Sequence, residues 1–191
     1  MIGPTFRFLR LDRTSMVQFE LFDKFAPMTK LRLTFLYCFL LLGVQYSYGQ
    51  SLPYQTLLKG LYDSSFPVVK PEQITELTNY QVLDAREKVE YQVSHLQHAK
   101  WVGHETFSLK TVAELDKNKP VLIYCTVGAR SEEVGKTLQK AGFKKVYNLY
   151  GGIFHWVNEG RTVFANGKPT LRVHAYSKPW SVWLNRGEKI Y

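Results

Sequence analysis

Short apolar runs alternate with amphipathic segments along the chain from about residue 68 to residue 160. The run "PVLIYC" at 120–125 is apolar, rich in β-branched residues and opened by a proline, so it predicts a short buried strand. Similar runs at 80–85, 98–102 and 144–150 predict further strands.

Helices are expected between these strands, where the apolar residues take a helical spacing. Ser108 is a candidate N-cap for one helix, and Gly142 stands where a C-terminal glycine would stop another. Gly151 and Gly152 are expected to turn the chain. The expected helices cover residues 71–77, 87–92, 108–116, 131–141 and 153–160.

This alternation of strands and helices predicts a parallel sheet covered by helices. In such sheets ligands bind at the carboxyl ends of the strands, where Cys125 is expected. Residues 161–191 break the alternation and are interpreted as an extension packed on the domain. Its Trp180 and Trp183 either close over the mouth of the site or only cover a sheet edge, and the second interpretation is the simpler one.

Residues 28–49 have the pattern of a signal peptide. Lys30 and Arg32 precede an apolar run at 33–44, and the small residues Ser47 and Gly49 predict cleavage after Gly49. The run is shorter than the about 20 residues that span a bilayer, so an uncleaved anchor is the second interpretation. We expect an exported protein, periplasmic or secreted, with no stable membrane anchor after cleavage.

Residues 1–27 precede this pattern and show neither a helical nor an alternating period. A signal peptide normally begins at the initiator methionine. We therefore hypothesise that Met28 is the true start and that residues 1–27 are not part of the native protein.

Composition limits the possible functions further. The chain has 191 residues, 45% of them hydrophobic, which suits one domain, expected at 50–160. The 25 lysines and arginines are scattered, and the densest local group is Lys144 with Lys145. No basic stripe with interleaved aromatic residues is present, so no nucleic-acid partner is expected.

Histidines and cysteines do not have the spacing of a metal site, and neither a Walker loop nor a GxGxxG motif occurs, so no metal or cofactor is expected. Cleavage of the signal peptide would remove Cys38 and leave Cys125 as the only cysteine. An internal disulfide would then be impossible in an exported protein. A lone cysteine is most often buried and inert, so its surroundings decide its role.

The segment "CTVGARS" at 125–131 follows the strand at 120–125 and leads into the helix at 131–141. If the loop curls around the sulfur, its N–H groups and the start of the helix stabilise a thiolate or an added anionic sulfur atom. Gly128 permits a tight curl, and Arg130 offers a cationic fork for an oxyanion.

Three segments, in order, resemble the motifs of rhodanese-like sulfurtransferases over about residues 66–160. "CTVGAR" resembles the CxxGxR active-site loop, "LDAREKVEYQVSHLQHA" the upstream motif, and "VYNLYGGIFHW" the closing strand with its Gly-Gly and Trp. Departures occur at Ser94, Gln97 and His98, which concern a local turn, and at Thr126, where a basic or polar residue is common.

The resemblance implies a three-layer α/β fold, with a central parallel five-stranded sheet and helices on both faces. It also implies a sulfurtransferase in which Cys125 takes the outer sulfur of a donor such as thiosulfate, carries a persulfide, and passes the sulfur to cyanide or a thiol. Asp84 and Arg86 are the expected supporting ion pair below the loop. The expected substrate-binding residues are Thr126, Val127, Gly128, Ala129, Arg130 and Ser131.

Two other functions stay open. Cysteine-dependent phosphatases also hold a thiolate in an anion-binding loop, but their loop has one residue more between the cysteine and the arginine than Cys125 and Arg130 have. A rhodanese fold can also serve as a binding or regulatory module without turnover. Inactive versions typically lose the cysteine, which this chain keeps.

Overall fold

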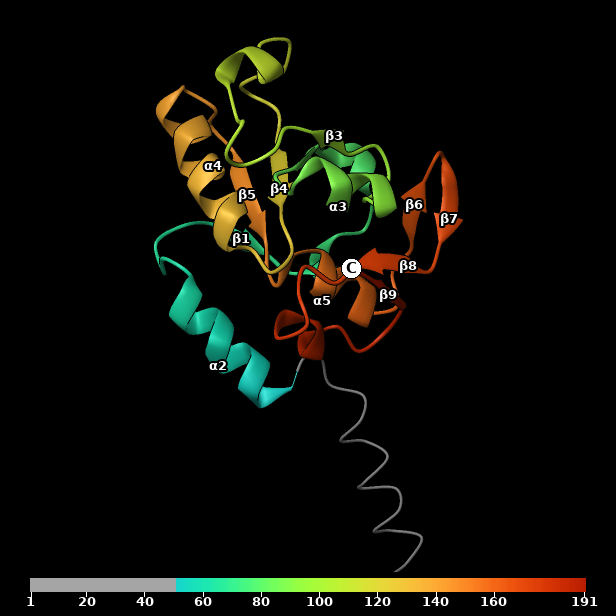
Figure 1. Cartoon of the computed structure of the whole chain (residues 1–191). Coiled ribbons are helices and arrows are strands. Elements are labelled where there is room, and N and C mark those ends of the chain that lie inside the picture. The colour runs from blue at the N-terminus through green and yellow to red at the C-terminus, as the bar shows by residue number, and fades with distance from the viewer. Residues whose placement is uncertain (1–50) are drawn as a thin grey trace, which may run out of the picture. The chain divides into compact units, whose positions relative to one another are not determined.

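A computed structural model describes residues 51–191 and shows a central parallel sheet of five short strands (Figure 1). The strands lie in the order β1-β5-β4-β2-β3, and every neighbouring pair is parallel. This confirms the expected fold class. The strands are β1 Val68–Val69, β2 Gln81–Asp84, β3 Lys100–Trp101, β4 Val121–Tyr124 and β5 Val146–Leu149. The expected signal peptide, its cleavage site and residues 1–27 lie outside the described residues.

Strand β4 is buried on both faces. Leu122 and Tyr124 contribute to the core on one side of the sheet, whereas Val121 and Ile123 contribute to the core on the other side. Successive side chains of a strand point to opposite faces, so a continuous apolar run is what a central parallel strand requires. The chain continues directly from Tyr124 into Cys125.

Helices cover both faces of the sheet. The helices α2 (Leu52–Leu61) and α5 (Gly152–Asn158) bury side chains in the first core, and α4 (Ala129–Lys140) buries Val134 and Leu138 in the second. The short helix α3 (Lys88–Val93) follows β2. Four 3₁₀ helices complete this part of the chain: η1 Pro71–Gln73, η2 Leu77–Asn79, η3 Leu109–Val112 and η4 Trp180–Trp183.

Two of the expected helices are wrong in type. The segment 71–77 forms the separate turn η1 because Ile74 adopts an extended conformation and points into the core. The segment 108–116 forms only the turn η3, although the hydroxyl of Ser108 accepts a hydrogen bond from the Lys110 amide as an N-cap does. Helix α2 was not among the expected elements.

Residues 161–191 pack on the domain. The Asn166-Gly167 turn has positive φ at both residues and joins β6 (Val163–Ala165) to β7 (Lys168–Thr170) as a hairpin. Strand β8 (Arg172–His174) pairs in parallel with β9 (Glu188–Ile190). The segment buries four apolar side chains in the first core: Val163, Val173, Ala175 and Leu184.

None of the helices within residues 51–191 is both long enough and apolar enough to cross a membrane.

Candidate functional site

Cys125 follows the last residue of β4 and is buried, with 1% of its surface exposed. The loop that follows turns the amide of Gly128 back toward the sulfur, and this N–H donates to Cys125 Sγ at 3.1 Å. Helix α4 begins at Ala129, so the positive end of its dipole lies beside the same loop. The sulfur therefore lies where an anionic form is stabilised.

The loop is fixed from inside the protein by β5. The side-chain amide of Asn148 donates through Nδ2 to the Gly128 carbonyl at 2.8 Å. The hydroxyl of Ser131 donates to Asn148 Oδ1 at 2.7 Å. Both side chains are fully buried. Ser131, expected among the substrate-binding residues, thus contacts the back of the loop.

Two tyrosines outside residues 66–160 bind the loop and the neighbouring Gly151. Tyr62, just after α2, donates to the Val127 carbonyl and accepts from the Gly151 amide at 2.8 Å. Tyr54 donates to the Gly151 carbonyl at 3.1 Å. Burial raises the pKa of both hydroxyls, and the charge of Cys125 raises it further, so both stay protonated.

The start of α5 binds the first carbonyls of the loop. The amides of Ile153 and Phe154 donate to the carbonyls of Cys125 and Thr126, at 2.9 and 3.2 Å. Gly152 has a φ of +57°, and a Cβ there would lie 2.6 Å from the carbonyl carbon of Thr126. Gly152 is therefore required by a close backbone approach behind the cysteine.

Replacing Gly128 by alanine is expected to lower the free energy of unfolding by about 2 kcal/mol and to slow any reaction of Cys125. Gly128 has a φ of +109°, and an added Cβ would lie 2.6 Å from Tyr62 Cζ, so Tyr62 would have to move from the Val127 carbonyl. Urea unfolding checks this. Gly167→Ala is the matched control, because Gly167 also has positive φ but no atom near its Cβ position. Equal losses in both variants would contradict a role of the Tyr62 contact.

Arg130 is bound by a buried carboxylate. Its guanidinium donates to the two oxygens of Glu90 at 2.8 and 3.0 Å and to the hydroxyl of Thr126 at 2.8 Å. Thr126 in turn donates to Glu90 at 2.9 Å, and Glu90 has 1% of its surface exposed. Arg130 and Thr126, both expected to bind substrate, therefore form one network with a glutamate 40 residues earlier in the chain.

Charge keeps this network ionised. Burial alone would raise the pKa of Glu90, but the hydrogen bonds and charge of Arg130 outweigh it, and the pKa lies below its usual value. Burial would likewise lower the pKa of Arg130, yet Glu90 and the charge of Cys125 raise it. His174 lies near these groups, and burial lowers its pKa, so it is neutral at neutral pH.

Glu90→Gln is expected to cost about 2 kcal/mol of stability at pH 7, with the loss shrinking as the pH falls below 4.5. A carboxylate with a lowered pKa stabilises the fold above its unfolded pKa, and this contribution disappears as the pH falls through its folded pKa. Urea unfolding of both proteins at several pH values measures the difference. A stability difference between the two proteins that does not change with pH would contradict the ion pair. Glu133→Gln, on the exposed side of α4, is the control for the change in net charge.

Asp84 and Arg86 form a fully buried ion pair, 2.7 Å between Oδ2 and Nη2. Arg86 also donates to the Ser94 carbonyl at 2.6 Å. The hydroxyl of Tyr124, the residue before Cys125, donates to Asp84 and accepts from the Leu96 amide. The pair thus connects the ends of the neighbouring strands β2 and β4 below the loop.

A cavity of about 160 Å³ opens at Cys125. Its lining residues are Leu61, Cys125, Thr126, Val127, Ala129, Arg130, Tyr176 and Trp180.

The C-terminal segment closes one side of this cavity. The Tyr176 ring lies 5.0 Å from the Arg130 guanidinium, and Trp180 packs edge-on against Tyr176. The interpretation that both tryptophans only cover a sheet edge is therefore wrong for Trp180. Trp183 packs against Tyr54 instead, with 5.3 Å between ring centroids.

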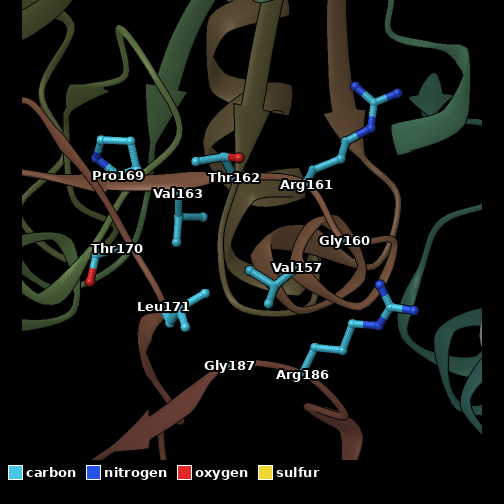
Figure 2. A pocket seen from close by; sticks show the side chains of 10 residues that line it. All are labelled: Val157, Gly160, Arg161, Thr162, Val163, Pro169, Thr170, Leu171, Arg186 and Gly187. Atoms are coloured by element: carbon cyan, nitrogen blue, oxygen red, sulfur yellow. The ribbon is translucent and has the colours of Figure 1, made fainter.

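A larger cavity of about 470 Å³ lies between α5 and the strands of the C-terminal segment. Figure 2 shows Val163 and Leu171 on one side of it and Arg161 and Arg186 on the other. None of its lining residues carries a thiol, an imidazole or a carboxylate. The hydroxyls of Thr162 and Thr170 therefore have no general base beside them in this lining, and the smaller cavity at Cys125 is the candidate site.

Sequence reasoning missed several residues of the site: Glu90, Asn148, Tyr62, Tyr176 and Leu61. Within residues 51–191, no three His, Cys, Asp or Glu side chains come together as a metal ion would require.

Comparison with known proteins finds similarity over the central part of the chain. Residues 71–159 match the family model described as a rhodanese-like domain. A tRNA uridine(34) hydroxylase of Buchnera aphidicola is 35% identical over 111 residues, 54% of this chain and 33% of that protein. One from Photorhabdus laumondii is 37% identical over 101 residues, 49% of this chain and 29% of that protein. The chain thus spans about a third of the length of these curated relatives.

Among solved structures, a thiosulfate sulfurtransferase from Pseudomonas aeruginosa aligns with a TM-score of 0.50 and 22% identity. The alignment covers 61% of this chain and 23% of that one. This likeness agrees with the fold described above.

Proposed function

Because residues 71–159 match the family model of a rhodanese-like domain, we propose that this protein transfers a sulfane sulfur through a persulfide on Cys125. The observation that carries the proposal is the position of Cys125 Sγ. The sulfur lies at the end of β4, accepts the Gly128 N–H at 3.1 Å at the start of α4, and lines a small cavity. Sulfur taken from a substrate would lie close to the same N–H group.

In the first half-reaction the Cys125 thiolate attacks the outer sulfur of the donor. A new S–S bond forms at Cys125, and the donor's S–S bond breaks, with its electron pair leaving on the inner sulfur. In the second half-reaction an acceptor such as cyanide or a thiolate attacks the outer sulfur of the persulfide. The Cys125 thiolate then leaves with the electron pair, and the enzyme returns to its first state.

The geometry favours sulfur transfer over phosphoester hydrolysis. Arg130, the residue that a phosphatase would direct at its phosphate, is bound by both oxygens of Glu90. The loop between Cys125 and Arg130 is also one residue shorter than a phosphatase loop, so it encloses a smaller space. A thiol that accepts a loop N–H and also lines an open cavity favours chemistry at the sulfur over binding alone.

The relatives named tRNA uridine(34) hydroxylase share only part of their length with this chain. We therefore restrict the proposal to the sulfur chemistry of the Cys125 loop and extend no RNA substrate to this protein.

Mass spectrometry of the intact full-length protein tests the proposal. The reduced protein is incubated with thiosulfate, methanethiosulfonate or benzenethiosulfonate and weighed before and after cyanide is added. We expect a gain of one sulfur atom with at least one donor and its loss to cyanide, with thiocyanate as the product. No gain with any of the three donors would overturn the proposed function.

A further inference from the structure

We propose that the natural donor is an organic sulfane-sulfur compound of low charge with an apolar body, a persulfide or a thiosulfonate, rather than a small dianion such as thiosulfate. This inference rests on the proposed function and concerns the substrate class of the same site. It is drawn from the charge, the lining and the size of the cavity at Cys125.

The cavity offers no unpaired cation to a dianion. Arg130 is the only lysine, arginine or histidine among its lining residues. Its guanidinium is bound by both oxygens of Glu90 and lies 3.8 Å from a carboxylate oxygen of Glu87. Two carboxylates thus face one guanidinium, so a doubly charged donor would enter without a compensating charge.

The walls of the cavity are apolar. Leu61 and Val127 line it, together with the rings of Tyr176 and Trp180. The Arg130 guanidinium also lies over the Tyr176 ring, 5.0 Å from its centroid, so this cation has an aromatic partner besides its carboxylates. Side chains of these types bind an apolar group and do not replace the hydration of a sulfonate with three oxygens.

The volume of the cavity suits a single aromatic ring. The cavity measures about 160 Å³. An engineered apolar cavity of about 150 Å³ in another protein binds benzene. A benzene-sized body therefore fits beside the sulfur, whereas thiosulfate would leave most of the apolar lining without a contact.

The transfer step is balanced with such a donor. For a thiosulfonate, the Cys125 thiolate attacks the terminal sulfur, the bond from that sulfur to the sulfonyl sulfur breaks, and a sulfinate leaves with the electron pair. For a persulfide, the leaving group is the thiolate of the inner sulfur. Total charge is conserved in both cases, and no oxidant or reductant is needed.

Three donors with the same type of reacting S–S bond distinguish the effect of the donor's charge from the effect of its apolar contacts. Thiosulfate is a dianion, methanethiosulfonate is a monoanion with a methyl group, and benzenethiosulfonate is a monoanion with a ring. The rate at which the full-length protein gains sulfur is measured with each donor and divided by the rate of the same donor with 2-mercaptoethanol. This ratio removes the intrinsic reactivity of the donor.

We expect benzenethiosulfonate to load Cys125 at least about tenfold faster than methanethiosulfonate, since the ring buries several more carbon atoms. Thiosulfate should be the slowest of the three. Normalised loading by thiosulfate that equals or exceeds loading by benzenethiosulfonate would overturn this inference and leave the proposed function standing. Absence of loading by all three would overturn the proposed function itself.

Two variants test separately the apolar lining of the cavity and the pairing of the Arg130 charge. Trp180→Ala removes one wall and should lower the preference for benzenethiosulfonate over methanethiosulfonate about tenfold, whereas Val182→Ala, on the same turn η4 but 62% exposed, should not change it. Glu90→Gln frees the charge of Arg130 and should raise the preference for thiosulfate over benzenethiosulfonate about tenfold. Glu133→Gln makes the same change of net charge at a side chain that is 72% exposed.

Unchanged preferences in both Trp180→Ala and Glu90→Gln would contradict the inference even if the native protein preferred the ring. Thermal melting shows whether each variant is folded. If Glu90→Gln does not fold, Trp180→Ala with the three donors still decides the outcome, because Trp180 lies on the rim of the cavity and not in the buried network.

Discussion

Replacing Cys125 by serine is expected to abolish sulfur loading and to leave the protein folded. A hydroxyl stays protonated at neutral pH, and the thiolate is the form that attacks sulfur. The two side chains have nearly the same shape, and the Gly128 N–H keeps an acceptor at this position. We therefore expect a change in stability below about 1.5 kcal/mol.

Intact mass after incubation with the three donors measures the loading, and urea unfolding measures the stability. Cys38→Ser is the matched control, because the full sequence contains two cysteines and Cys38 is the other one. We expect Cys38→Ser to gain sulfur as the native protein does. Loading that survives in Cys125→Ser and disappears in Cys38→Ser would contradict the assignment of the nucleophile.

Replacing Asp84 by alanine is expected to lower the free energy of unfolding by about 3–5 kcal/mol, the largest loss of stability among the changes considered. The Arg86 guanidinium would stay fully buried without its counter-charge, and the Tyr124 hydroxyl would lose its acceptor. Burial alone would lower the pKa of Arg86, and Asp84 provides the charge that raises it. Urea unfolding followed by Trp fluorescence measures the loss.

Two further variants show whether the loss of stability comes from the unpaired buried charge. Glu114→Ala breaks the exposed ion pair with Lys100 and should leave the unfolding midpoint nearly unchanged. The double variant Asp84→Ala with Arg86→Met should be more stable than Asp84→Ala alone, because it removes the buried charge. A double variant that is less stable than the single one would contradict the explanation by an unpaired charge.

Much of the fold was predictable because its central elements have strong local patterns. The apolar run at 120–125 and the helix that ends before Gly142 needed no knowledge of distant contacts. The prediction was wrong at 71–77, where Ile74 leaves the helical conformation to enter the core. Helix α2 could have been found from Pro53 near its start and from the spacing of Tyr54 and Leu58.

The site was only partly predictable, because its loop is one continuous segment whereas the residues that hold the loop come from distant parts of the sequence. Cys125, Gly128 and Arg130 lie within one short segment, whereas Glu90 is 40 residues from the arginine that it binds. A glutamate in the first turn of α3 has the pattern of an ordinary helix cap, and Glu90 does accept from the Glu87 amide. Tyr176 has positive φ in an irregular segment, where no periodicity points to a function.

The parallel pairing of β8 with β9 holds both ends of the segment between these strands. Residues 175–187, which carry Tyr176 and Trp180, leave the end of β8 and return to the start of β9. Surface loops anchored at both ends tolerate insertions and substitutions better than the elements that hold them. The rim of the cavity and the reactive loop after β4 are thus held by separate elements, with Ala175 and Leu184 fixing the rim segment in the core. Under the proposed function, exchanging this segment between homologues is expected to change which sulfur donor the site accepts.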